Sequence, residues 1–185
     1  MITCSSKGIL ATETSEITMQ ISLLPAAASD KPALANLMQL YHYDLSEFDD
    51  ADVDERGYFH DTRLDGNWTV ADHHPFLIRV DDRLAGFALV DHHSRLHNPF
   101  DGHAVADFFV MRRYRRQGIG RAAASLLFDH FPGPWEVSAY AENVPGHVFW
   151  RGVIDRYTGG HYTELWHQTA NWRGPVQSFV VLATG

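Results

Sequence analysis

The stretch that decides the fold is VMRRYRRQGIGR, residues 110–121. It ends an apolar run, 103–111, and leads into apolar residues at helical spacing, 119–131. This pattern predicts a strand, a turn rich in arginine and glycine, and the start of a helix. The first N–H groups of a helix have no internal acceptor, and the helix dipole adds partial positive charge there. Glycines let an anion approach closely, and arginines donate paired hydrogen bonds to phosphate. We therefore predict a diphosphate site here, in preference to a plain basic turn.

Apolar patterning on both sides of this stretch predicts the other elements. Strands are expected at 17–23, 76–80, 84–92, 103–111, 135–140, 162–167 and 176–182. Helices are expected at 30–48, 54–65, 119–131 and 146–157. This order predicts one α/β domain over 16–185, with a mixed, mostly antiparallel sheet and helices on both faces. Residues 1–15 are expected to form a flexible leader.

Composition and charge narrow the function classes. The chain has 185 residues and a formal net charge of −8, which argues against nucleic acid and is compatible with a cationic amine. Cys4 is the only cysteine, so no intrachain disulfide forms, and a cytoplasmic location is expected. No apolar run reaches 18 residues, so we expect no membrane span. The sequence is also compatible with a homodimer.

Two motifs resemble those of a known family. Arg115-x-x-Gly118-x-Gly120 is similar to the (Gln/Arg)-x-x-Gly-x-(Gly/Ala) signature of the GNAT superfamily of acyl-CoA-dependent N-acyltransferases. Glu142-Asn143, Gly146 and Phe149-Trp150 resemble its Glu-Asn-x-x-Ala-x-x-Phe-Tyr segment. The resemblance covers about residues 16–183 and implies a GNAT-like fold.

The resemblance also implies a co-substrate and a reaction. Acetyl-CoA would lie with its pyrophosphate on the loop amides and its pantetheine arm along the strand 107–111. The acetyl group would pass to an amine, on a small molecule or a peptide. The implied cofactor-binding residues are Phe109, Val110, Met111, Arg115, Arg116, Gln117, Gly118, Ile119, Gly120, Arg121, Asn143, Phe149 and Trp150.

Two positions depart from the family pattern. Gly146 replaces the usual alanine, and Trp150 replaces a tyrosine that protonates the departing thiolate in related enzymes. Tryptophan offers only an indole N–H donor, so it is not that acid. This departure supports an alternative function, a catalytically silent acyl-CoA-binding module.

Three residues are candidates for proton transfer. Asp107 stands on the strand before the loop, where related enzymes often carry an acidic base, although a surface or salt-bridged carboxylate accounts for it equally well. Tyr114 and Tyr140 are candidates for the acid that Trp150 does not supply. Each tyrosine is also interpretable as an amphipathic packing residue.

Histidines and acidic residues form two further groups. Six of the twelve histidines lie in or near the hairpin: His73, His74, His92, His93, His97 and His103. No tight Cys/His spacing accompanies them, so we predict solvated histidines, one of them open to a role as base, and no metal site. After the first helix come Asp44, Glu47, Asp49, Asp50, Asp52 and Asp54. They either attract a cationic amine or form a solvated loop, and the sequence favours the loop.

Overall fold

The computed structural model describes residues 19–60, 64, 72–170 and 172–183. The predicted leader, 1–15, lies outside these residues, and so do 17–18 of the first predicted strand. The elements are β1 (Ile21–Pro25), η1 (Ala28–Asp30), α1 (Lys31–Leu45), β2 (His74–Val80), β3 (Arg83–Asp91), β4 (His103–Val110), η2 (Arg112–Tyr114), α3 (Ile119–His130), β5 (Gly133–Ser138), α4 (Val144–Thr158), β6 (Thr163–Gln168) and β7 (Arg173–Val181).

One seven-stranded sheet organises the chain, in the order β1-β2-β3-β4-β5-β7-β6. Only β4 and β5 are parallel neighbours, and α3 makes the crossover between them. The other neighbouring pairs are antiparallel. The predicted mixed, mostly antiparallel sheet is therefore confirmed. The β2–β3 hairpin turns at Asp81 and Asp82, with φ of 47° and 61°, a left-handed turn whose twist matches that of the strands.

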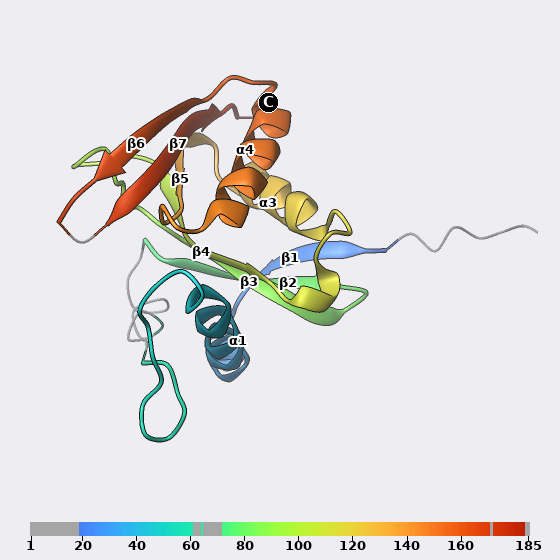
Figure 1. The fold of residues 1–185 in the computed structure, drawn as a ribbon. Helices are drawn as coiled ribbons and strands as arrows, with labels where there is room; N and C mark the ends of the chain where they lie inside the picture. The colour runs from blue at the N-terminus through green and yellow to red at the C-terminus, as the bar shows by residue number, and fades with distance from the viewer. Residues whose placement is uncertain (1–18, 61–63, 65–71, 171, 184–185) are drawn as a thin grey trace, which may run out of the picture.

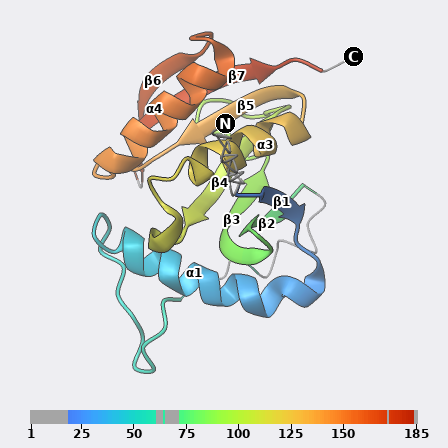
Figure 2. The same ribbon diagram turned by 90° about the vertical axis from the view of Figure 1, so that its right-hand side faces the viewer.

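Helices cover both faces of the sheet, as expected. On one face α1 buries Leu34, Leu37 and Met38 against residues of β2, β3 and β4. The opposite face packs against α3 and α4, whose Leu127, Phe128 and Ile154 are fully buried. Figure 1 shows α1 below the sheet and α3 and α4 above it. The view turned by 90° shows the same two layers, with α1 running beneath β2, β3 and β4 (Figure 2).

The sheet opens between its two parallel strands. β4 pairs with β5 at residues 103–105 only, and β5, β7 and β6 then diverge from β1–β4 (Figure 1). At the same level Leu89 pairs with Asp107 but Val90 pairs with Val105, so Ala106 is an extra residue in β4. Such a bulge reverses which face the following side chains point to. Asp107 and Phe109 therefore face the α1 side of the sheet.

The helix predicted at 54–65 is wrong over 54–60. There the chain forms a turn closed by a bridge between Val53 and Phe59. The Asp54 carboxylate accepts hydrogen bonds from the N–H groups of Arg56 and Tyr58, and such a side-chain turn competes with a helix. Gly57 adopts a left-handed φ of 78°. Of the remaining predicted range, only Leu64 is described.

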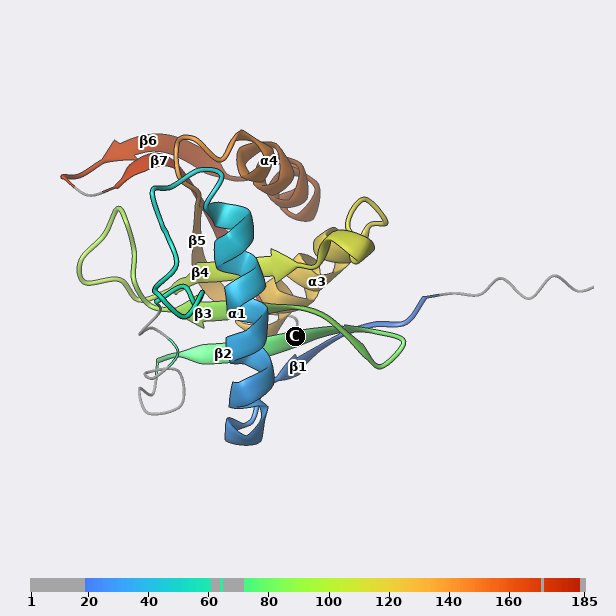
Figure 3. The same ribbon diagram turned by 60° about the horizontal axis from the view of Figure 1, so that its bottom comes forward.

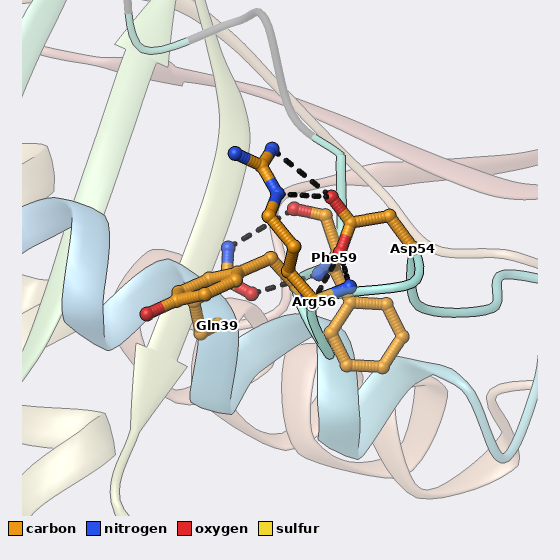
Figure 4. A network of polar contacts seen from close by, with 5 residues as sticks. Gln39, Asp54, Arg56 and Phe59 are labelled. Carbon is orange, nitrogen blue, oxygen red and sulfur yellow. Dashed lines mark hydrogen bonds and ion pairs between the residues drawn. The ribbon is translucent and has the colours of Figure 1, made fainter.

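The segment after α1 returns along the helix. In Figure 3, residues 46–60 leave the end of α1 and come back beside it. Gln39 of α1 fixes this return, because its side chain accepts from the Phe59 N–H at 2.8 Å and donates to the Phe59 carbonyl at 3.1 Å. Figure 4 shows both bonds beside the Asp54–Arg56 contacts.

Candidate active site

A cleft of about 1010 Å³ opens where β4 separates from β5. Its walls come from α1, the end of β4, the turn after it, and α4. Thirteen cofactor-binding residues were predicted, and ten of them line it: Phe109, Val110, Arg115, Arg116, Gly118, Gly120, Arg121, Asn143, Phe149 and Trp150. These ten residues come from β4, the turn after it, α3 and the N-terminal half of α4 with its N-cap.

The predicted anion-binding turn forms one end of the cleft. Gly118 is the N-cap of α3, with a left-handed φ of 80° and no capping side chain. The first N–H groups of α3 therefore have no intrahelical acceptor, and the N-cap residue offers them no side-chain acceptor. Arg116 is also left-handed, with φ of 60°. A Cβ on Gly120 would lie 3.2 Å from the Phe149 ring, so a glycine here lets Phe149 of α4 pack close to the start of α3.

Arg115 is fixed against the protein. Its Nε donates to the Val110 carbonyl at 2.6 Å, its guanidinium pairs with Asp44 of α1, and it lies 5.5 Å above the Phe109 ring. Arg112 also contacts Asp44, at 2.8 Å. These contacts join the turn to α1. The sequence did not predict this structural role of Asp44, because the residue stands in an acidic stretch. All three predicted phosphate-binding arginines line the cleft: Arg115, Arg116 and Arg121.

Aromatic residues line the α4 wall. Phe149 stacks on Phe108 with ring centroids 5.8 Å apart, and Trp150 meets Phe108 edge-on at 5.1 Å. Trp150 is 7% exposed. Asn143 caps α4 by accepting from the Gly146 N–H at 2.9 Å, and a Cβ at position 146 would lie 2.7 Å from the Asn143 amide. Glycine at 146 therefore permits this close cap.

Three predicted cofactor residues lie outside the lining. Ile119 is fully buried in the core under α3. Gln117 donates from its side chain to the Arg113 carbonyl at 2.8 Å. The Met111 N–H bonds the Ala85 carbonyl at 2.8 Å, and its side chain packs against the α1 cluster.

A second cleft, of about 480 Å³, contains Asp107. It opens on the α1 face, because Glu136 and Ser138 of β5 alternate with Trp135 and Val137, which pack in the core on the α3 and α4 side. Asp107 and Glu136 are each 3% exposed. Glu136 accepts from the Ser94 hydroxyl at 2.6 Å and from the Arg95 N–H at 2.9 Å. Glu136 was not predicted as a site residue from the sequence, although a lone carboxylate in an apolar strand indicates a buried polar site.

The two candidate tyrosines border neither described cleft. Tyr114 packs against the core under α3, and Arg113 lies 5.9 Å from its ring. Tyr140 is 40% exposed, with its ring 6.4 Å from that of Trp172. Its carbonyl accepts from the Asn143 N–H at 3.0 Å, which joins it to the first cleft.

The acidic stretch after the start of α1's last turn, residues 44–55, lies partly inside and partly outside the first cleft. Asp44 and Glu47 line the first cleft. Asp49 and Asp52 accept from the N–H groups of Ala51 and Val53, and Asp54 forms the turn described above. None of the residues from Asp49 to Glu55 lines either described cleft.

Three of the hairpin histidines enter the aromatic core. His103 stacks on Phe131 at 4.5 Å and meets His92 at 4.7 Å, and His74 lies 4.9 Å from Phe131. Burial lowers the pKa of His103 to about 4, with a further contribution from His92. The pKa of His74 is also lowered, first by burial and then by His92. These rings are therefore partly desolvated, contrary to the solvated histidines predicted here.

Comparisons with known proteins identify the fold and the family. Among solved structures, RimL, a ribosomal L7/L12 alpha-N-protein acetyltransferase in complex with coenzyme A, aligns with a TM-score of 0.63 at 14% identity, covering 89% of this chain and 96% of that one. The spermidine N-acetyltransferase of Vibrio cholerae, in complex with CoA and spermine, aligns at 0.58 and 10%, covering 88% and 96%. The Escherichia coli ribosomal-protein-S18-alanine N-acetyltransferase aligns at 0.56 and 14%, covering 90% and 97%.

At these identities the structures show a shared fold. No curated protein matches significantly in sequence. Within the described residues, no helix is long and apolar enough to cross a membrane. The profile of the Acetyltransferase (GNAT) family matches residues 33–150, more than half of the sequence. The chain therefore belongs to the GNAT family of acetyltransferases.

Proposed function

We propose that this protein is an N-acetyltransferase that moves an acetyl group from acetyl-CoA to an amine on a small molecule or a peptide. The observation that carries the proposal is the uncapped start of α3 at Gly118, which opens into a cleft beside Arg116 and Arg121. A diphosphate there would accept hydrogen bonds from the first N–H groups of α3 and lie at the positive end of the helix dipole.

The rest of acetyl-CoA would extend along the cleft. From the start of α3, the pantetheine arm would run beside Phe109 and Val110, against Asn143 and Phe149 of α4. Because β4 separates from β5 beyond residue 105, backbone groups near the bulge at Ala106 are available to hold the acetyl carbonyl. Such groups would also stabilise the oxyanion that forms when the amine attacks.

Asp107 is the proposed base. It lies one residue beyond the bulge and lines the second cleft, on the α1 face of the sheet. An amine that reached the acetyl group through this cleft would pass a buried carboxylate able to accept its proton. A cationic acceptor suits this cleft, because Asp91, Asp107 and Glu136 all line it.

Tyr140 is the better placed of the two candidate acids. Its carbonyl bonds the N–H of Asn143, a lining residue of the first cleft, whereas Tyr114 packs under α3. Protonation of the CoA thiolate by Tyr140 would pass through a water molecule, because its ring lies outside the lining. Tyr140→Phe should lower kcat more than Tyr114→Phe, and equal effects would remove Tyr140 from this role.

The experiment that tests the function is product analysis. The protein would be incubated with acetyl-CoA and a panel of polyamines, lysine peptides and peptides with free N-termini, with mass spectrometry of the amines. We expect one acetylated amine per CoA released, and Asp107→Asn should reduce kcat by about 100-fold or more, as for loss of a general base. Tight CoA binding without any acetylated amine would favour the silent binding module.

A further inference from the structure

Two His-His dipeptides mark the open end of the β2–β3 hairpin. Strand register pairs His74 with Val90, so His73 stands opposite Asp91, next to His92 and His93. Successive residues of a strand point to opposite faces, so the two histidines of each dipeptide lie on opposite faces of the sheet. The rings of His74 and His92 lie 6.1 Å apart, and those of His73 and His93 lie 6.2 Å apart.

The two pairs have different surroundings. His74 and His92 pack with His103 and Phe131 in the aromatic core. His73 and His93 instead line the second cleft together with Asp91. His73 and Asp91 are half-buried, whereas His93 is exposed. The second pair is thus accessible from solvent and has a carboxylate beside it.

The geometry of these three side chains fits a metal ion. One ligand atom from each of His73, Asp91 and His93 lies within 4.8 Å of the other two. The Asp91 Oδ2 and His93 Nδ1 atoms are 3.3 Å apart. A tetrahedral zinc ion with bonds of about 2.0–2.1 Å holds its ligand atoms roughly 3.3–3.4 Å apart. Asp91 and His93 already have that spacing, and His73 offers a third ligand atom within 4.8 Å of both.

The protein holds Asp91 and His93 in place before any ion binds. The His93 N–H donates to Asp91 Oδ1 at 2.9 Å, which leaves Oδ2 directed towards His93 Nδ1. The next residues are fixed by Glu136, which accepts from Ser94 and Arg95. A preorganised site loses less conformational entropy on binding.

We propose that His73, Asp91 and His93 bind a divalent transition-metal ion, with Zn²⁺ as the best match. Two imidazole nitrogens and one carboxylate oxygen suit Zn²⁺ and its neighbours, whereas Mg²⁺ and Ca²⁺ require mostly oxygen ligands. Three protein ligands leave one position of a tetrahedral ion for water or a substrate, and all three ligands line the second cleft. The sequence did not reveal the site, because its ligands meet only through the register of the hairpin.

The test is metal binding by the full, untagged chain. Equilibrium dialysis against Zn²⁺ should give one ion per chain, and Co²⁺ should give the visible absorption of a low-coordinate site. His73→Asn and Asp91→Asn should each weaken Zn²⁺ binding by about 100-fold or more, because even the loss of a residue that only supports a ligand costs 10- to 100-fold. His161→Asn, on the turn after α4, is the matched control and should bind like the parent. A large excess of Mg²⁺ should not displace the ion.

Three results would overturn the proposal. Either no stoichiometric Zn²⁺ is retained, or His73→Asn and Asp91→Asn bind it as the parent does, or His161→Asn loses it equally. The first result would mean that Asp91 and His93 form an ion pair only. Circular dichroism would establish that each variant is folded, with His93→Asn replacing any variant that is not. Acetyl transfer is not part of the readout, so this outcome is independent of the proposed function.

Discussion

Two glycines of this chain have nearly the same left-handed backbone but different surroundings. Gly57 has φ of 78° and Gly118 has φ of 80°, and a Cβ on either would meet no atom within 4 Å. Gly118 borders the first cleft at the start of α3, whereas Gly57 sits in the turn after α1. They form a matched pair, because a side chain costs about 1–2 kcal/mol of backbone strain at each.

Gly118→Glu should abolish CoA binding. The new carboxylate would stand at the start of α3, where the CoA diphosphate is expected, and two anions repel there. Gly57→Glu should lower the free energy of unfolding by a similar amount but leave CoA affinity unchanged. Calorimetric titration with CoA, beside thermal unfolding, separates binding from strain. Equal affinities in the two variants would place the diphosphate elsewhere.

Trp150→Phe should keep most of the activity. Trp150 packs against Phe108 and Phe149, so the smaller ring should cost about 1–2 kcal/mol of stability through lost packing. Because indole is no acid, kcat should fall by less than about 10-fold, whereas loss of a general acid costs roughly 100-fold or more. A 100-fold fall in kcat with normal CoA affinity and folding would show that Trp150 has a catalytic role.

At the scale of the elements, β4 and α3 could be predicted because local patterns define them. An apolar run, a glycine turn and a helical repeat are all present within residues 103–131. The helix expected at 54–65 failed because Asp54 bonds the backbone of its own turn, which apolar spacing does not reveal. The bulge at Ala106, which sets the face of Asp107, depends on pairing with β3 and has no local signal.

The histidine end of β2, β3 and β4 should make stability depend on pH. The pKa of His103 is lowered to about 4, from 6.5 in the unfolded chain. Between these values the unfolded state binds more protons, so stability is present above about pH 6.5 and falls as the pH drops towards 4. The excess stability of the parent over His103→Phe should therefore shrink across this range. Urea unfolding at several pH values measures it, and a constant difference would contradict the burial of His103.

At the scale of the whole molecule, the net charge of −8 should draw cationic amines to the protein. The carboxylates of Asp91, Asp107 and Glu136 meet at one cleft although they come from three strands or strand ends, an arrangement that only the fold creates. The composition was compatible with a cationic acceptor. It gave no indication of which carboxylates would meet at the cleft.

For an active cationic amine, kcat/KM should fall as salt rises, because the Debye length shortens to about 10 Å at 0.1 M. An Asp49→Asn, Asp50→Asn, Asp52→Asn variant changes the net charge from −8 to −8 + 3 = −5. These residues line neither described cleft, so the variant should flatten the salt dependence without changing kcat. An unchanged salt dependence would exclude this loop from steering.

The central claim is that an acetyl group passes from CoA held at the start of α3 to an amine. The most direct measurement is the rate of acetyl-amine formation from acetyl-CoA, by mass spectrometry, in the parent, Gly57→Glu and Gly118→Glu. Transfer by the parent and Gly57→Glu, with none by Gly118→Glu, is the predicted result. Transfer by Gly118→Glu at the rate of Gly57→Glu, or release of CoA without any acetylated amine in the parent, would contradict the claim.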